Sequence, residues 1–135
     1  MSILADTSGL LALLDVDSER HGAARTLLAQ EELLVPSSVL CEVDYMVTTR
    51  LGAAVAQAFL EDVVSGAYGF LQVEFTDVAR ALELMRPYAD AQVGYVDASV
   101  VALAERHRLN RVLTLDRRHF SMFRPKGSTH LELLP

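Results

Sequence analysis

The sequence predicts an α/β fold: a three-layer α/β/α sandwich around a four- to five-stranded, mostly parallel sheet. Two observations support this fold class. Short apolar runs recur along the chain, and segments with apolar residues at helical spacing separate them. Each of these segments is long enough for a helical crossover, which is the connection that parallel strands need. The 135 residues also suit one domain with a single core, which we expect to span 1–135.

The N-terminal half is expected to contribute two strands and four helices. The strands are short apolar runs, at Ser2–Ala5 and 33–35. The helices carry apolar side chains at helical spacing, at 8–14, 19–30, 37–52 and 53–66. Thr7 or Ser8 is expected near the N-cap of the first helix, and Gly52 near the end of the third. The helix pair at 37–66 is longer than one crossover needs, so it is a candidate flap or partner surface.

The C-terminal half is expected to contribute up to three strands and two helices. The strands are placed at 70–75, 112–115 and, as an edge strand, 130–134. Thr76 is expected to cap the first helix, which ends at about Pro87, and Asp97 leads the second. Phe120 and Phe123 are expected to anchor a final loop.

Composition and motifs exclude several classes of protein. No apolar run approaches the roughly 18 residues of a membrane span, and the N-terminus lacks the basic start of a signal peptide. A single cysteine, Cys41, cannot form an internal disulfide, so we expect a cytoplasmic protein. The sequence contains no P-loop, dinucleotide-binding glycine motif, hydrolase nucleophile elbow or zinc-ligand spacing.

Charge is divided unevenly along the chain. The net charge of −6 argues mildly against a generic nucleic-acid binder. Residues 1–104 carry five basic and fifteen acidic side chains, whereas 105–126 carry seven basic and two acidic ones. Six of those seven are arginines, which suit phosphate groups. The basic segment is therefore either a solvated helix and loop or a surface that contacts phosphate, and the sequence leaves both open.

Four carboxylates hold positions that could converge. Asp6 and Asp116 directly follow predicted strands, and ligands of open parallel sheets bind beyond the carboxyl ends of strands, where the strand order reverses. The two meet if their strands flank that point. Asp97 begins the helix that leads into the second of these strands, so it should lie at the same edge. Glu42 borders the apolar face of its helix, whereas Asp44 lies on the far side as an ordinary surface acid.

Each acid has a structural explanation on its own, as a helix cap, a turn residue or a half-exposed side chain. Together they would repel one another and raise each other's pKa unless a cation offset the charge. Oxygen ligands without paired Cys or His favour Mg²⁺ or Mn²⁺. Such an ion suits phosphodiester hydrolysis by an activated water. Of the histidines, His119 alone neighbours a site acid, and a structural hydrogen bond is its expected role.

Four stretches in order, LADTS, PSSVLCEVDYMVTTR, YVDASVVALAERH and VLTLDRRHF, resemble the PIN-domain family, most closely its VapC-type toxins. The resemblance covers essentially the whole chain. It implies a metal-dependent endoribonuclease that uses Mg²⁺ or Mn²⁺ and leaves a 5′-phosphate and a 3′-hydroxyl on tRNA or ribosomal RNA. It also implies homodimers and silencing by a small antitoxin, expected on the helix pair at 37–66. A catalytically silent PIN-like binding module is the alternative, which the complete set of acids disfavours.

The resemblance also implies roles for the residues. Asp6 and Asp97 would be the primary metal ligands, and Asp116 would complete the site directly or through water. Glu42 would bind a second ion or orient the attacking water. Hydroxyls beside the first and last acids are represented by Thr7 and Thr114. The arginines next to the last acid, Arg117 and Arg118, are candidate RNA contacts.

Overall fold

The computed structural model describes residues 1–127 and 130–135, whose strands form a five-stranded parallel sheet in the order β3-β2-β1-β4-β5. The strands are β1 Ser2–Ala5, β2 Glu32–Pro36, β3 Gly69–Leu71, β4 Arg111–Leu113 and β5 Glu132–Leu134. In the register, Leu4 of the central strand β1 lies beside Leu34 of β2 and Val112 of β4. The predicted fold class and the predicted edge strand at the C-terminus are thereby confirmed.

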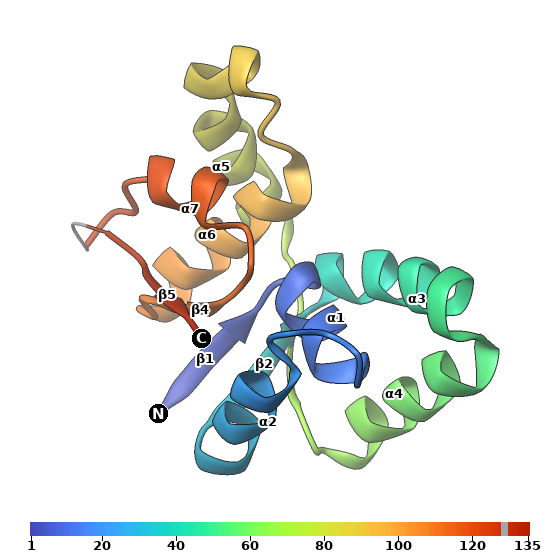
Figure 1. Ribbon diagram of the computed structural model, residues 1–135. Coiled ribbons are helices and arrows are strands. Elements are labelled where there is room, and N and C mark those ends of the chain that lie inside the picture. Colours follow the sequence, from blue (N-terminus) through green and yellow to red (C-terminus); the bar gives the residue numbers. More distant parts are fainter. Residues whose placement is uncertain (128–129) are drawn as a thin grey trace.

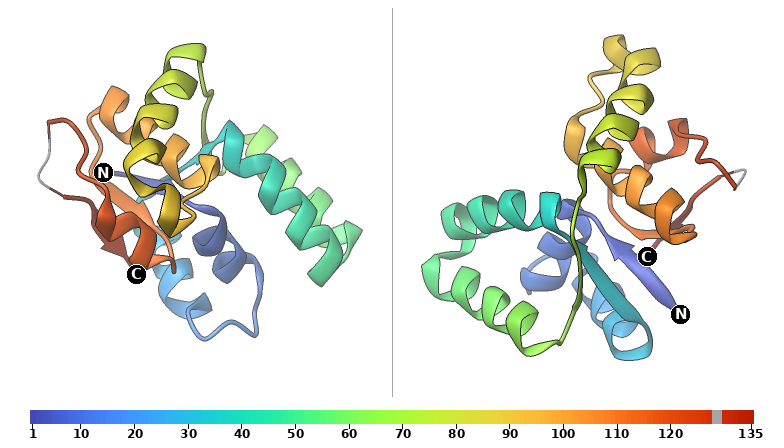
Figure 2. Two further views of the ribbon diagram at one scale, coloured as in Figure 1. Left: turned by 90° about the horizontal axis from the view of Figure 1, so that it is seen from above. Right: turned by 180° about the vertical axis from the view of Figure 1, so that it is seen from behind.

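Helices cover both faces of this sheet. They are α1 Thr7–Leu14, α2 His21–Gln30, α3 Ser37–Leu51, α4 Ala53–Ser65, α5 Phe75–Met85, the 3₁₀ helix η1 Arg86–Ala91, α6 Tyr95–His107 and α7 Arg117–Met122. The chain steps from β1 to β2 to β3 and then returns past β1 to β4 and β5. Right-handed crossovers therefore place α1–α4 on one face and α5–α7 on the other, as Figure 1 shows. The α3–α4 pair projects from the sheet (Figures 1 and 2).

The core centres on β1 and α6. Ile3, Leu4 and Ala5 are fully buried because β1 is the central strand and has helices on both sides. Residues 98–104 of α6 are all buried, since α6 lies between the sheet and α5. Each fully buried Leu or Val side chain contributes about 1.5–3 kcal/mol through removal of apolar surface from water. None of the helices in the described residues is both long and apolar enough to cross a membrane.

The strand predicted at 70–75 is shorter in the structure, and its helix starts earlier. β3 ends at Leu71 because the Val73 backbone N–H donates to the Ser37 Oγ at 2.8 Å instead of to a strand. Glu74 and Asp77 then form a reciprocal capping box, which starts α5 at Phe75. Thr76 is therefore not the cap, and that prediction is wrong.

The strand predicted at 112–115 also ends early, at Leu113. The Leu115 N–H donates to the Ser8 Oγ at 2.8 Å, which turns the chain away from the sheet. α7 follows where a loop was expected, with Asp116 at its N-cap accepting a hydrogen bond from the His119 backbone N–H at 3.2 Å. Six residues are too few to show helical periodicity in the sequence.

Two helix starts differ from the expected ones. α1 begins at Thr7 with Asp6 at its N-cap position, although the Asp6 side chain makes no capping hydrogen bond. The expected caps, Thr7 and Ser8, lie inside the helix. α6 begins at Tyr95 after Gly94, so Asp97 lies in its first turn rather than leading it.

Candidate active site

The site lies where the strand order reverses, between β1 and β4. The two strands are neighbours, and the Asp6 backbone N–H donates to the Leu113 carbonyl at 2.9 Å. Asp6 and Thr114, the residues directly after β1 and β4, therefore meet at the carboxyl edge of the sheet. The condition on which the expected meeting of Asp6 and Asp116 depended, that their strands flank the reversal, is therefore met.

A cavity of about 450 Å³ opens at this edge, and all four predicted acids line it. Asp6 directly follows β1, Glu42 lies on α3, Asp97 lies on α6 and Asp116 is the N-cap of α7. The other lining residues are Thr7, Ser8, Leu11, Met46, Gly94, Tyr95, Val96 and His119. Glu42 is solvent-exposed, and Asp44, expected to be the surface acid, is half-buried outside the lining. Four segments far apart in the sequence thus contribute one carboxylate each to a shared space.

A chain of hydroxyl hydrogen bonds holds Asp6 in place. The buried Thr114 hydroxyl donates to Asp6 Oδ2 at 3.0 Å, lies 3.1 Å from the Ser8 Oγ and accepts the Asp116 N–H at 2.9 Å. Thr114, the hydroxyl expected beside the last acid, thus contacts the first acid, Asp6. Ser8 was not predicted as a site residue. It contacts the β4–α7 turn rather than capping α1, a partnership that local sequence does not reveal.

The other Asp6 oxygen is not engaged. Asp6 is only 3% exposed, yet its Oδ1 has no hydrogen-bond partner among residues 1–127 and 130–135, and neither does the buried Thr7 hydroxyl. Buried polar atoms without a partner are rare, because they lose their hydration without compensation. Both side chains line the acid cavity, so a bound ion or water could satisfy the Asp6 oxygen and the Thr7 hydroxyl.

Asp97, Asp116 and His119 form the closest group of candidate ligands in the cavity. One donor atom from each lies within 4.8 Å of the others. The His119 Nδ1 is 3.0 Å from Asp116 Oδ2 and 3.5 Å from Asp97 Oδ2. The sequence singled out two of these three residues. His119 could have been found from the Asp-x-x-His spacing, which places the ring on the same side of a short helix as its N-cap.

Burial and mutual repulsion raise the pKa of two of the acids, Asp6 and Asp97. Burial raises the pKa of Asp6 to about 6, although nearby donors such as Thr114 oppose the shift. Burial raises the pKa of Asp97 to about 7, and the charges of Asp6 and Asp116 add to this effect, while His119 opposes it. The cavity therefore holds more negative charge than it can stabilise by itself, which is the condition that favours a cation.

The stability of the metal-free protein should fall as pH rises from about 4 to 8. Asp6 and Asp97 have folded-state pKa values of about 6 and about 7, above the ordinary value of 3.8, so the folded state holds more protons in this range. Their contribution is complete below pH 3.8 and is lost as pH rises through 6 and 7. Urea unfolding in EDTA should show the wild type losing about 1–3 kcal/mol more than Asp97→Asn across this range. Equal losses of unfolding free energy in the two proteins would contradict this assignment of the pH dependence to Asp97.

The fold divides the Arg-rich segment 105–126. Two of its arginines bind acids from elsewhere in the chain, Arg106 with Asp77 at 2.9 Å and Arg111 with Glu31 at 3.0 Å. Arg117 donates to the Pro135 carbonyl at 2.7 Å. Arg118 is exposed, and within the described part of the chain its guanidinium makes no hydrogen bond or ion pair. The segment is therefore not a single phosphate-contacting surface, and Arg118, which directly precedes the lining residue His119, is an exposed cation available for a ligand.

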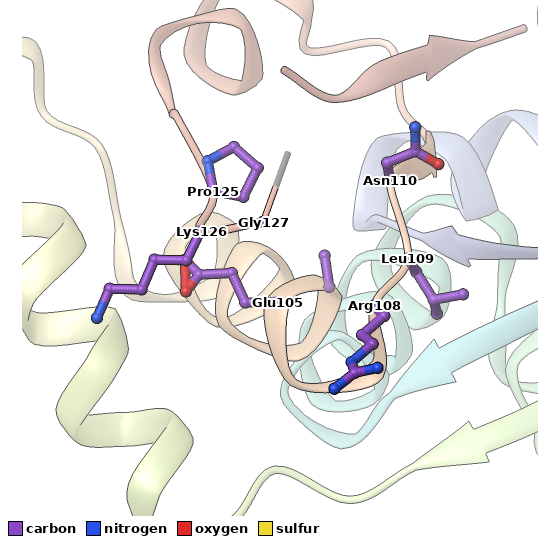
Figure 3. A pocket seen from close by; sticks show the side chains of 8 residues that line it. Glu105, Arg108, Leu109, Asn110, Pro125, Lys126 and Gly127 are labelled. Atoms are coloured by element: carbon purple, nitrogen blue, oxygen red, sulfur yellow. The ribbon is translucent and has the colours of Figure 1, made fainter. Parts of the chain in front are cut away.

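A second cavity, of about 520 Å³, lies at the other end of α6 (Figure 3). Arg108, Leu109 and Asn110 line one side, and Pro125, Lys126 and Gly127 the other. Glu105, the one acid in its described lining, accepts hydrogen bonds from Arg80 at 2.9–3.2 Å. This cavity offers no group of unpaired carboxylates, so the acid-lined cavity is the candidate active site.

Comparisons with known proteins agree with this geometry. The PIN domain family matches residues 3–124. The ribonuclease VapC26 of Mycobacterium tuberculosis is 35% identical, over 98% of this chain and all of that protein. The structure of VapC20 from the same species, a toxin that cleaves the sarcin–ricin loop, superposes with a TM-score of 0.83 at 23% identity, covering 98% of this chain and 99% of the other.

A further likeness is to VapBC2 of Rickettsia felis bound to a promoter DNA fragment. Its TM-score is 0.73 at 15% identity, and all of both chains is covered. At these identities the two solved structures support the fold alone, whereas the family match and the VapC26 relative cover nearly the full length. The chain belongs to the PIN-domain family, among its VapC-type members.

Proposed function

We propose that this chain is a metal-dependent endoribonuclease and the toxin of a VapBC-type toxin–antitoxin pair, acting in the cytoplasm. The observation that carries the proposal is the convergence of Asp6, Glu42, Asp97 and Asp116 on one cavity at the switch point of the sheet. The name of the VapC26 relative, a ribonuclease, supports the same class of reaction. A catalytically silent PIN-like module would have no need to keep buried, repelling acids with raised pKa values.

The residues present suit a hard divalent cation. Asp6 has a buried oxygen without a partner, and Asp97 and Asp116 present carboxylate oxygens to the same cavity. Asp6, Asp97 and Asp116 would hold Mg²⁺ or Mn²⁺. When bound, such an ion would polarise a phosphoryl oxygen and lower the pKa of a water molecule. The charge of the ion would also offset the repulsion from Asp6 and Asp116, which adds to burial in raising the pKa of Asp97.

The chain's own residues would then position the reactants. Thr114 fixes the Asp6 carboxylate through the 3.0 Å hydrogen bond, so that carboxylate needs no reorganisation during the reaction. Glu42, exposed in the cavity, would orient the attacking water and accept its proton. The water oxygen attacks phosphorus while the bond to the 3′ oxygen breaks. The 3′ oxygen takes up a proton from solvent, which leaves a 5′-phosphate and a 3′-hydroxyl.

The decisive experiment is cleavage of purified tRNA and ribosomal RNA by the protein in EDTA, in Mg²⁺ and in Mn²⁺. We expect discrete products with 5′-phosphate ends in either metal and intact RNA in EDTA. Equal cleavage in EDTA would show that the reaction needs no divalent ion. No cleavage of any cellular RNA in either metal would favour the silent binding module.

The toxin proposal requires protein partners, and the α3–α4 pair is the proposed antitoxin surface. Tyr45 on α3 and Val64 on α4 are 71% and 88% exposed, so each helix of the pair presents an apolar side chain that a partner could cover. A toxin–antitoxin complex from Klebsiella pneumoniae is among the structural neighbours, with a TM-score of 0.65. We also propose a homodimer and a toxin–antitoxin hetero-oligomer. Expression should arrest growth, and co-expression of a neighbouring small gene should relieve the arrest; harmless expression would remove the toxin label.

Arg118→Ala is expected to weaken RNA binding about 3- to 10-fold at moderate salt, because the change removes one exposed cation beside the site. The slope of log affinity against log salt should become shallower by about 0.7 for single-stranded RNA. Binding is measured in the Asp6→Asn background so that RNA stays intact. Arg25→Ala, at an exposed position on α2, is the matched control. The same loss in both variants would point to overall charge instead of a local contact.

A further inference from the structure

We propose that His119 binds the metal ion through Nδ1 and that this nitrogen makes the site prefer Mn²⁺ to Mg²⁺. The inference rests on the metal site of the proposed function and adds a ligand of a different chemical class to its carboxylates. It also assigns a role to a side chain whose expected part was a structural hydrogen bond.

The positions of the donor atoms support this role. The His119 Nδ1 lies 3.0 Å from Asp116 Oδ2 and 3.5 Å from Asp97 Oδ2. Neighbouring ligands of one octahedral ion, each about 2.1 Å from it, are about 3.0 Å apart. The His119 Nδ1 therefore lies at the spacing of an adjacent ligand from Asp116 Oδ2 and within about 0.5 Å of it from Asp97 Oδ2, and all three donor atoms lie within 4.8 Å of one another. A nitrogen that points between two carboxylates is suited to take up such an ion as the neutral tautomer, with its proton on Nε2.

Local structure holds the ring in this position. Asp116 accepts the His119 backbone N–H at 3.2 Å, which closes the first turn of α7. The next residue, Phe120, is fully buried in the core and anchors the helix against the sheet. By contrast, the ring of His21 is engaged with the Ala12 carbonyl at 3.1 Å and lies outside the cavity.

A second observation points independently to a ligand here. Asp6 is 97% buried and lines the same cavity, and its Oδ1 has no hydrogen-bond partner among the described residues. Hydrogen bonding between His119 and Asp116 accounts for the histidine alone, but it leaves this carboxylate oxygen unsatisfied. A cation in the cavity accounts for both.

The chemistry of the donors determines the expected selectivity. Mg²⁺ prefers oxygen ligands in a near-ideal octahedron, whereas imidazole suits first-row transition metals. A site of oxygens alone would discriminate weakly between Mg²⁺ and Mn²⁺. With one nitrogen donor, Mn²⁺ gains affinity that Mg²⁺ does not.

The test is pulsed electron paramagnetic resonance of Mn²⁺ bound to the intact protein, together with calorimetric titration of Mn²⁺ and of Mg²⁺. We expect a ¹⁴N coupling of directly bound imidazole in the wild type and its loss in His119→Asn. Asparagine offers an oxygen near the position of Nδ1, so the variant should bind Mn²⁺ about 10-fold more weakly and Mg²⁺ within about 3-fold of the wild type. His107→Asn, exposed at the far end of α6, should keep the coupling.

Three results would overturn the inference: no ¹⁴N coupling in the wild type, coupling that survives His119→Asn, or equal weakening of both ions in a folded variant. Circular dichroism and the melting temperature in EDTA establish that the variant is folded. RNA cleavage in Mn²⁺ without nitrogen coupling would contradict the inference and leave the proposed function standing. Nitrogen coupling without cleavage of any RNA would support the histidine ligand and contradict the proposed ribonuclease function.

Discussion

Replacing Asp6 with asparagine is expected to lower the rate of RNA cleavage at least about 1,000-fold, because the change removes a charge that only the bound metal would balance. The Thr114 hydroxyl could still donate to the remaining amide oxygen, so the shape of the site is preserved. The loss should appear in single-turnover cleavage of a fixed RNA at saturating Mg²⁺ or Mn²⁺. It should be accompanied by weaker metal binding in calorimetry.

Stability separates this effect from simple unfolding. Burial raises the pKa of Asp6 to about 6, so its ionised form is unfavourable in the metal-free protein above that pH. Asp6→Asn should therefore be at least as stable as the wild type in EDTA at pH 8. Asp44→Asn makes the same chemical change on α3, outside the cavity lining, and should cleave RNA at the wild-type rate. An active Asp6→Asn would end the assignment of this carboxylate to catalysis.

The parts of the fold that sequence could predict are those determined by local apolar pattern. β1 was predicted with its observed bounds, because a central parallel strand reads as an uninterrupted apolar run. The meeting of Asp6 and Asp116 required one further rule, that ligands bind at the carboxyl edge where strand order reverses. The acids could therefore be placed without any knowledge of side-chain contacts.

The errors fall where a distant side chain determines the local conformation. Ser37 accepts the N–H that would have continued β3, and Ser8 accepts the N–H that would have continued β4. Neither partnership follows from residues near the strand that ends. Ion pairs are equally hard to predict from local sequence, because the partners are distant: Arg106 and Asp77 are 29 positions apart, and Arg111 and Glu31 are 80 apart. A run of cations in sequence could not be divided into paired and available ones before the fold was known.

Gly9→Ala is expected to destabilise the protein by about 2–4 kcal/mol, because a methyl group at this position has no room. A Cβ on Gly9 would lie 2.4 Å from the Leu113 carbonyl oxygen and 2.8 Å from its carbonyl carbon. These are backbone atoms at the end of β4, so no flexible side chain can move aside. The same Leu113 oxygen accepts the Asp6 N–H at 2.9 Å. Relief of the clash must therefore separate α1 from β4 and shift Asp6 relative to Thr114.

Gly22→Ala is the matched control, since a Cβ at that position meets no atom within 4 Å. Gly22 lies within α2, where alanine is the better helix former, so this change should stabilise the protein by about 0.5–1 kcal/mol. Urea unfolding should therefore show that the same added methyl group lowers the free energy of unfolding at Gly9 and raises it at Gly22. Because the Gly9 methyl acts at the β1–β4 junction, the RNA cleavage of any folded Gly9→Ala fraction should also fall. A Gly9→Ala protein with wild-type stability and activity would show that α1 does not pack against β4 as closely as the structure places it.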